Sequence, residues 1–204
     1  MTHPAEPLIA ELDATLGAAP DGWRITTLRR LTDLFLAGAA SYTDDQVAVF
    51  DDVISRLIEK IENRTLIELS NKLAEVDNAP SKVIAALARH PDILVAEPVL
   101  KNSPVLKDQD LAEIADKARK NQALLLTIAG RPQLGETVTD VLITRGNSAV
   151  AQKVLDNAGA RVSELGFAKL VSGVERDKEL AAVIAKREDL PAELRPWITA
   201  ALAQ

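Results

Sequence analysis

The segment LARHPDILVAEPVL, residues 87–100, recurs as LITRGNSAVAQKVL, residues 142–155, with the same apolar pattern and different polar residues. The shared apolar pairs are Leu87 and Leu142, Val95 and Val150, Ala96 and Ala151, Val99 and Val154, and Leu100 and Leu155. A short amphipathic helix cannot bury its apolar face alone, so stacked helices must repeat their apolar residues while outward-facing residues diverge. The repetition therefore predicts a solenoid of short helices.

Further segments repeat in the same way. IAGRPQLGETVTDVL, residues 128–142, matches IAKREDLPAELRPWI, residues 184–198, and VLKNSPVLKDQDLAEI, residues 99–114, matches VLDNAGARVSELGFAKL, residues 154–170. The matches are imperfect, which indicates a degenerate array of the general HEAT type, with two antiparallel helices per unit. Asp92 and Asn147 can fill the turn position that is usually Asp in a HEAT unit.

The composition favours an all-α protein with an aliphatic core. The chain has 204 residues, of which 47% are hydrophobic and only 3% aromatic. Ala and Leu favour helices, and the apolar residues fall at helical spacing rather than in alternation. The absence of Cys excludes disulfides and thiolate chemistry.

Charge and turn residues place a domain boundary near residue 80. Residues 1–80 carry a net charge of −7 and residues 81–204 a net charge of +1. The turn-forming segment VDNAPS lies where the charge changes. We therefore predict an N-terminal helical bundle over residues 1–79 and HEAT-like repeats over residues 80–204.

Apolar stripes and turn residues give the expected helices. In the bundle they lie near residues 8–16, 23–40, 44–61 and 66–76; in the repeats they lie near 81–89, 92–101, 108–119, 121–129, 134–144, 148–156, 163–172, 175–186 and 191–203. The heptad-like stripes of the bundle fit a hairpin packed within its own domain. They also fit a seam for a homodimer.

Several side chains have the pattern of helix caps. Thr43 with Gln46 forms a capping box, and Asp108 and Ser163 are expected N-caps. Asp51 and Asp52 are expected on the solvated face of their helix.

No motif for catalysis, cofactor binding or metal binding is present, so we expect no enzyme activity, no cofactor and no metal. The phosphate-binding loop, the dinucleotide fingerprint and the zinc-protease motif are all missing. His3 and His90 lack companion ligands, and we expect a turn or capping role for His90. Neither a run of about 18 apolar residues nor a signal-peptide pattern occurs, so a cytoplasmic protein without membrane contact is expected.

Four arginines at the repeat turns are the candidate partner-binding residues: Arg89, Arg131, Arg145 and Arg187. Equivalent turn positions in a solenoid project from one edge, so the forked guanidinium groups could form an anion-binding ridge. Alternatively, each arginine bonds helix C-terminal carbonyls, which also attract cations.

Three stretches together resemble the bacterial domain-of-unknown-function family 2336: LARHPDILVAEPVLKNSPVLKDQDLAEIA, TIAGRPQLGETVTDVLITRGNSAVAQKVLDNAGARVSELGFAKLV and AKREDLPAELRPWI. The resemblance extends over roughly residues 25–204 and is strongest from residue 81. It implies an all-α, HEAT-like protein with no assigned enzyme activity and no catalytic residues to carry over. Members that resemble this chain often continue past its DLP segment, so the natural chain is expected to be able to extend beyond Gln204.

These observations predict a non-enzymatic interaction scaffold, such as a regulatory or signalling adaptor that binds a protein or peptide on the solenoid surface. The alternative is a nucleic-acid-binding or base-processing protein using Trp197, Arg195, Arg145 and Asp140. A sequence pI near 5.1 disfavours the alternative. A small-molecule sensor with its site in the helical core remains a third reading. Trp23 and Trp197 are expected to pack near helix starts, with Trp197 partly exposed if its cover lies outside this chain.

Overall fold

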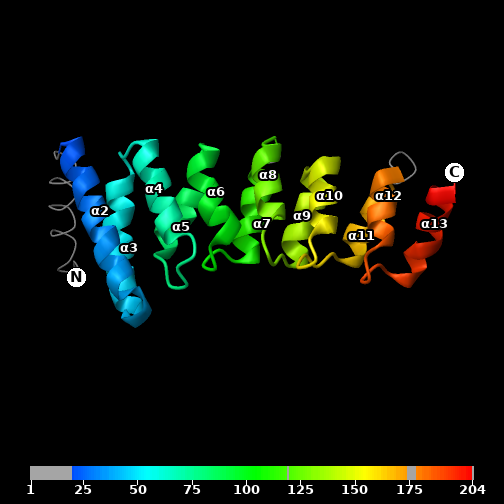
Figure 1. The fold of residues 1–204 in the computed structure, drawn as a ribbon, viewed down its shortest axis with the longest axis horizontal. Coiled ribbons are helices and arrows are strands. Elements are labelled where there is room, and N and C mark those ends of the chain that lie inside the picture. Colours follow the sequence, from blue (N-terminus) through cyan, green and yellow to red (C-terminus); the bar gives the residue numbers. More distant parts are fainter. Residues whose placement is uncertain (1–19, 119, 174–177, 204) are drawn as a thin grey trace, which may run out of the picture. The chain divides into compact units, whose positions relative to one another are not determined.

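The computed structural model describes residues 20–118, 120–173 and 178–203, and the regular elements in these ranges are helices (Figure 1). The predicted helix over residues 8–16 and the residue His3 lie outside the described residues. No β-strand occurs in the described ranges, although Leu134 and Ala160 form one isolated parallel bridge. The predicted all-α fold class is therefore confirmed.

The predicted helices between residues 81 and 203 are present with small shifts at their ends. The described α-helices are α2 (Asp21–Gly38), α3 (Asp44–Ile58), α4 (Asn63–Leu73), α5 (Ser81–Ala88), α6 (Ile93–Asn102), α7 (Asp108–Lys117), α8 (Gln122–Ala129), α9 (Glu136–Arg145), α10 (Ser148–Asp156), α11 (Glu164–Val171), α12 (Lys178–Ala185) and α13 (Arg195–Ala203). Short 3₁₀ turns, η1 (Ala39–Ser41) and η3 (Ala192–Leu194), follow α2 and precede α13.

The chain forms two compact units. Among the described residues, unit 1 comprises 20–99 with 103–105, and unit 2 comprises 100–102 with the described residues from 106 to 203. In unit 1, α2 packs on α3 and α4, and α5 packs on α3 and α4. An aromatic cluster of Phe35, Tyr42 and Phe50, with ring centroids 5.2 to 6.0 Å apart, joins the end of α2 to α3.

Unit 2 stacks its helices in two rows. One row contains α7, α9 and α11, and the other contains α8, α10 and α12, each helix packing on the next of its row (Figure 1). Helix α13 packs on α12. A continuous solenoid over all of residues 80–204, and a separate domain over residues 1–79, remain predictions.

The repeated apolar residues belong to the core, as the repetition predicts. All ten are buried: Leu87, Val95, Ala96, Val99, Leu100, Leu142, Val150, Ala151, Val154 and Leu155. These side chains are packed closely and away from water, which explains why both copies of the repeat keep apolar residues at these positions.

Most predicted caps are present. The Thr43–Gln46 capping box forms, and Ser163 Oγ accepts a hydrogen bond from the Gly166 N–H at 2.9 Å. His90 has the expected turn role, because its Nδ1 accepts from the Asp92 N–H at 3.1 Å. Asp108 is not an N-cap, which corrects the prediction. Lys107 holds that position, and Asp110 accepts from the Lys107 N–H at 3.2 Å.

The prediction that Asp51 is solvated is also wrong. Its relative exposure is 4%, and its carboxylate accepts from the N–H groups of Lys82 and Val83, both at 2.9 Å. Helix α5 follows Pro80, which offers no side-chain cap, so a carboxylate on α3 caps α5 from a distance. Asp52 is exposed, as predicted, and accepts from Lys82 Nζ at 2.5 Å. That contact raises the pKa of Lys82.

Replacing Asp51 should therefore destabilise unit 1. In Asp51→Ala, two N–H groups at the start of α5 lose a charged acceptor in a buried place, and we expect a loss of about 3 kcal/mol in the free energy of unfolding. Asp51→Asn should lose less, because the amide oxygen still accepts. Urea denaturation followed by circular dichroism measures both.

Asp52→Ala is the matched control, since it removes a carboxylate at the neighbouring exposed position. The urea concentration at which half of Asp52→Ala is unfolded should stay near that of the wild type. Equal losses for Asp51→Ala and Asp52→Ala would contradict the capping role.

Candidate functional site

Two of the four predicted arginines hold equivalent positions in the repeat and make equivalent bonds. Arg131 Nη1 donates to the Leu100 carbonyl at 2.6 Å, and Arg187 Nη1 donates to the Leu155 carbonyl at 3.3 Å. Leu100 and Leu155 are themselves equivalent and lie near the ends of α6 and α10. Each arginine thus bonds the C-terminal end of a helix in the preceding repeat, where unpaired carbonyls carry partial negative charge.

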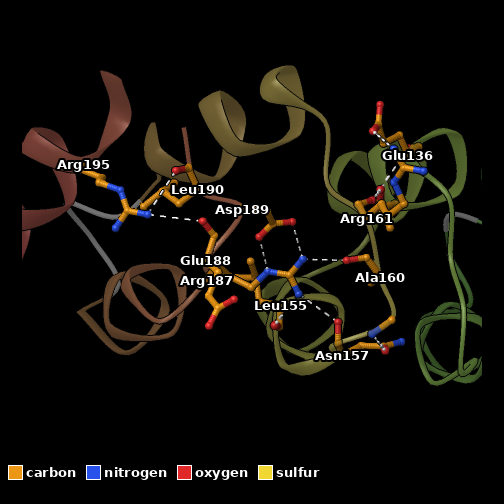
Figure 2. A network of polar contacts seen from close by, with 12 residues as sticks. Glu136, Leu155, Asn157, Ala160, Arg161, Arg187, Glu188, Asp189, Leu190 and Arg195 are labelled. Atoms are coloured by element: carbon orange, nitrogen blue, oxygen red, sulfur yellow. Dashed lines mark hydrogen bonds and ion pairs between the residues drawn. The ribbon is translucent and has the colours of Figure 1, made fainter. Parts of the chain in front are cut away.

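Arg187 makes the fuller set of contacts (Figure 2). Its guanidinium group also donates to the carbonyls of Asn157 at 2.9 Å and Ala160 at 2.7 Å. Asp189 pairs with the same group through two contacts, at 2.8 and 2.7 Å. Through these bonds Arg187 stabilises the turn after α10. Its side chain is only 11% exposed, so it offers little surface to a ligand.

Arg131 is more deeply buried, with 9% relative exposure. Burial lowers its pKa, while the nearby Asp108 carboxylate acts in the opposite direction. An arginine keeps its charge at neutral pH even so, and the charged group binds the Leu100 carbonyl.

The other two arginines are exposed but also have partners. Arg145 Nε donates to Asp116 Oδ1 at 2.7 Å, and Arg89 Nη1 donates to the Ala85 carbonyl of its own helix at 3.2 Å. Arg131 and Arg187 therefore bond backbone carbonyls, as the alternative prediction has it, and do not stand free on an exposed ridge. Partner binding through Arg89 and Arg145 stays a prediction.

The turns of unit 2 are hydrogen-bonded to one another. Asn157 Nδ2 donates to the carbonyls of Ala129 at 3.1 Å and Arg131 at 2.6 Å. The Leu134 N–H donates to the Gly159 carbonyl, and the Arg161 N–H donates to the Leu134 carbonyl. Gly159 permits this close approach, since a Cβ there would lie 1.8 Å from the Pro132 carbonyl oxygen. The turn after α8 and the turn after α10 therefore form one bonded edge.

A cleft of about 570 Å³ lies beside this edge. Its lining contains Leu155, Asp156, Ala158, Ala160, Arg161, Val183, Lys186, Arg187, Glu188 and Asp189. The three acidic and three basic side chains balance, so the cleft has no net charge with which to select an anion. Arg161, whose side chain is 79% exposed, makes one weak contact of 3.4 Å with Glu136 (Figure 2).

Three residues of the nucleic-acid alternative make hydrogen bonds or ion pairs within the chain. Asp140 accepts from Ser163 Oγ at 2.7 Å, which orients the cap of α11. Arg195 donates to the carbonyls of Glu188 and Leu190 at 3.5 and 3.4 Å. Arg145 pairs with Asp116 at 2.7 Å, and Trp197 is the large apolar side chain of the set, with 66% exposure.

Trp197 is 66% exposed, so of its two expected arrangements, packed or partly exposed, the structure has the exposed one. It lies on α13, where only Ile198 and Ala201 are buried. Trp23, on α2, is also open at 46% exposure. Both side chains lie away from the buried stripes of their helices, and periodicity does not reveal this for a single tryptophan.

Other classes of site find little support within the described ranges. No group of three or more His, Asp or Glu side chains there could hold a metal ion. None of the helices described is long and apolar enough to span a bilayer. A space between α2 and α4 has a volume of about 20 Å³, which is room for one water molecule rather than a metabolite.

The fold and these surfaces define a protein of packed short helices with structural arginines at its turns. A family model covers residues 95–204, which is more than half of the chain. The chain belongs to that family, which is described as an uncharacterised protein conserved in bacteria (DUF2336). No curated protein and no solved structure matches the chain.

Arg187→Ala should destabilise unit 2 by about 3 kcal/mol, because three carbonyls and Asp189 lose a charged donor. Arg187→Lys should recover little of this, since an ammonium group cannot reproduce the planar fork. Thermal unfolding followed by circular dichroism measures both variants.

Arg161→Ala provides the control, because its side chain is 79% exposed and its ion pair is long. Its melting temperature should match that of the wild type. If Arg187→Lys melts at the same temperature as the wild type, the positive charge alone stabilises the turn, and the forked geometry of the guanidinium group is not needed.

Proposed function

We propose that the protein is a binding scaffold that takes a protein partner, and that the exposed surface of α13 is the docking face. The observation that carries the proposal is the 66% exposure of Trp197. Tryptophan is strongly enriched among the residues that dominate binding energies at interfaces, and a free surface rarely presents one so openly.

The chemistry of α13 supports a docking role. Its exposed residues after Arg195 are Pro196, Trp197, Thr199, Ala200, Leu202 and Ala203, none of them charged. An exposed helix face without charge is suited to burial against another protein.

Charge favours a protein over a nucleic acid as the partner. The chain carries a net charge of −6, and Arg195, the one basic residue of α13, donates to backbone carbonyls. Phosphate binding needs basic groups free to displace counterions. The scaffold thus fits a regulatory or adaptor role in which binding, rather than chemistry, is the activity.

Affinity capture from a bacterial lysate, quantified by mass spectrometry, tests this function. Wild-type protein should enrich a partner at least about tenfold over Trp197→Glu. The introduced carboxylate would have to lose its water when the partner binds, or it would prevent the partner from binding. The purified partner should then bind the variant with a Kd raised by a similar factor.

Leu165→Glu is the matched control, since Leu165 is an exposed apolar residue, at 81%, on a different helix. It should capture the same partner as the wild type. An unchanged set of captured proteins for Trp197→Glu would refute α13 as the docking face.

A further inference from the structure

Helix α6 (Ile93–Asn102) is shared between the two units, because the border between them falls inside it. Residues 93–99 belong to unit 1 and residues 100–102 belong to unit 2, whereas each of the other described α-helices lies within one unit. A bend of one unit against the other therefore has to pass through this helix or through the loop that follows it.

The two ends of α6 are bonded to different units. At its start, the N-cap Asp92 accepts a hydrogen bond from Asn63 Nδ2 of α4 at 2.7 Å, and both residues belong to unit 1. At its end, the Leu100 carbonyl accepts from Arg131 Nη1 at 2.6 Å, and both residues belong to unit 2. Each end of this helix of 10 residues is thus held by a separate unit.

Pro98 interrupts α6 between these two attachments. Proline has no N–H, so the Leu94 carbonyl, four residues earlier, lacks its helical donor. Leu94, Glu97 and Lys101 are all exposed on this side of the helix, so water can reach that carbonyl. A helix that lacks a hydrogen bond on its solvent side bends more easily there than at its intact turns.

The internal repeat shows that the core does not require this proline. The buried apolar residues of α6 recur in α10 (Ser148–Asp156), where Lys153 takes the position of Pro98. Helix α10 contains no proline and lies wholly within unit 2. The proline therefore distinguishes the helix that crosses the border from its counterpart in the repeat.

We propose that α6 is a hinge, and that unit 1 and unit 2 bend against each other about Pro98. Asp92 keeps the first part of the helix on unit 1, and the Leu100 carbonyl keeps the last turn on unit 2. Between them the Leu94 carbonyl is bonded by water, so the two parts tilt without breaking a helical hydrogen bond at that point. The hinge goes beyond the proposed function, because it belongs to the free chain and needs no partner.

Pulsed electron paramagnetic resonance on the full chain tests the hinge. The protein has no Cys, so spin labels attach only where Cys is introduced. Labels on Ala48→Cys of α3 and Ala168→Cys of α11 report a distance between the units, and labels on Ala123→Cys of α8 and Ala168→Cys report a distance within unit 2. All three alanines are exposed. The first pair should give a broader distribution of distances than the second.

Pro98→Ala, and Pro98→Lys, which copies the residue of α10, should remove this excess width, because the introduced N–H can bond the Leu94 carbonyl. Hydrogen exchange should show that the introduced amide is protected. Glu97→Ala is the matched control, since it changes an exposed neighbour on the same helix without adding an N–H. It should leave the distribution as broad as in the wild type. Circular dichroism establishes that the variants are folded.

The inference is overturned if the first pair of labels in the wild type gives a distribution as narrow as that of the second. It is also overturned if both proline variants keep the broad distribution, or if Glu97→Ala narrows it as much as they do. An unprotected amide at position 98 in both variants would count against it equally, since the proline would then not be what interrupts the helix.

Discussion

Helices of eight to ten residues leave most of their C-terminal carbonyls without a partner inside the helix, and unit 2 is built from such helices. In a packed stack those carbonyls are shielded from water, so side chains must bond them. Arg131 and Arg187 supply guanidinium groups, and Asn157 supplies an amide. Each donor comes from the repeat that follows its acceptor, with the result that neighbouring repeats stabilise each other.

The same constraint is met differently in unit 1. Helix α5 begins after a proline that cannot cap it, and the buried carboxylate of Asp51 on α3 bonds its first N–H groups. In both units, then, a charged side chain from another part of the fold completes a helix end. Such contacts fix the position of one helix against the next more closely than apolar packing does, because hydrogen bonds are directional.

This use of charge changes where binding can take place. Arginines at turns resemble an anion-binding edge, yet a guanidinium group that already bonds three carbonyls and a carboxylate has no donor left to offer. In unit 2 the exposed face of α13 after Arg195 is uncharged, and Trp197 on it is open to solvent. That face is the docking surface that we propose.

The amino-acid sequence by itself determined the helices, their approximate ends, most of their caps and the identity of the core, because period, turn residues and repetition are local or repeat at a fixed spacing. It also singled out Arg131 and Arg187, and it named helix C-terminal carbonyls as one of their two possible targets. Only the tertiary structure decided between those targets, placed Asp51 inside the molecule and left Trp197 outside it. The physical reason is that burial and hydrogen-bond partners depend on which elements meet. The carbonyl that Arg187 binds at Leu155 lies 32 residues away in the chain, and no period within a single helix connects them.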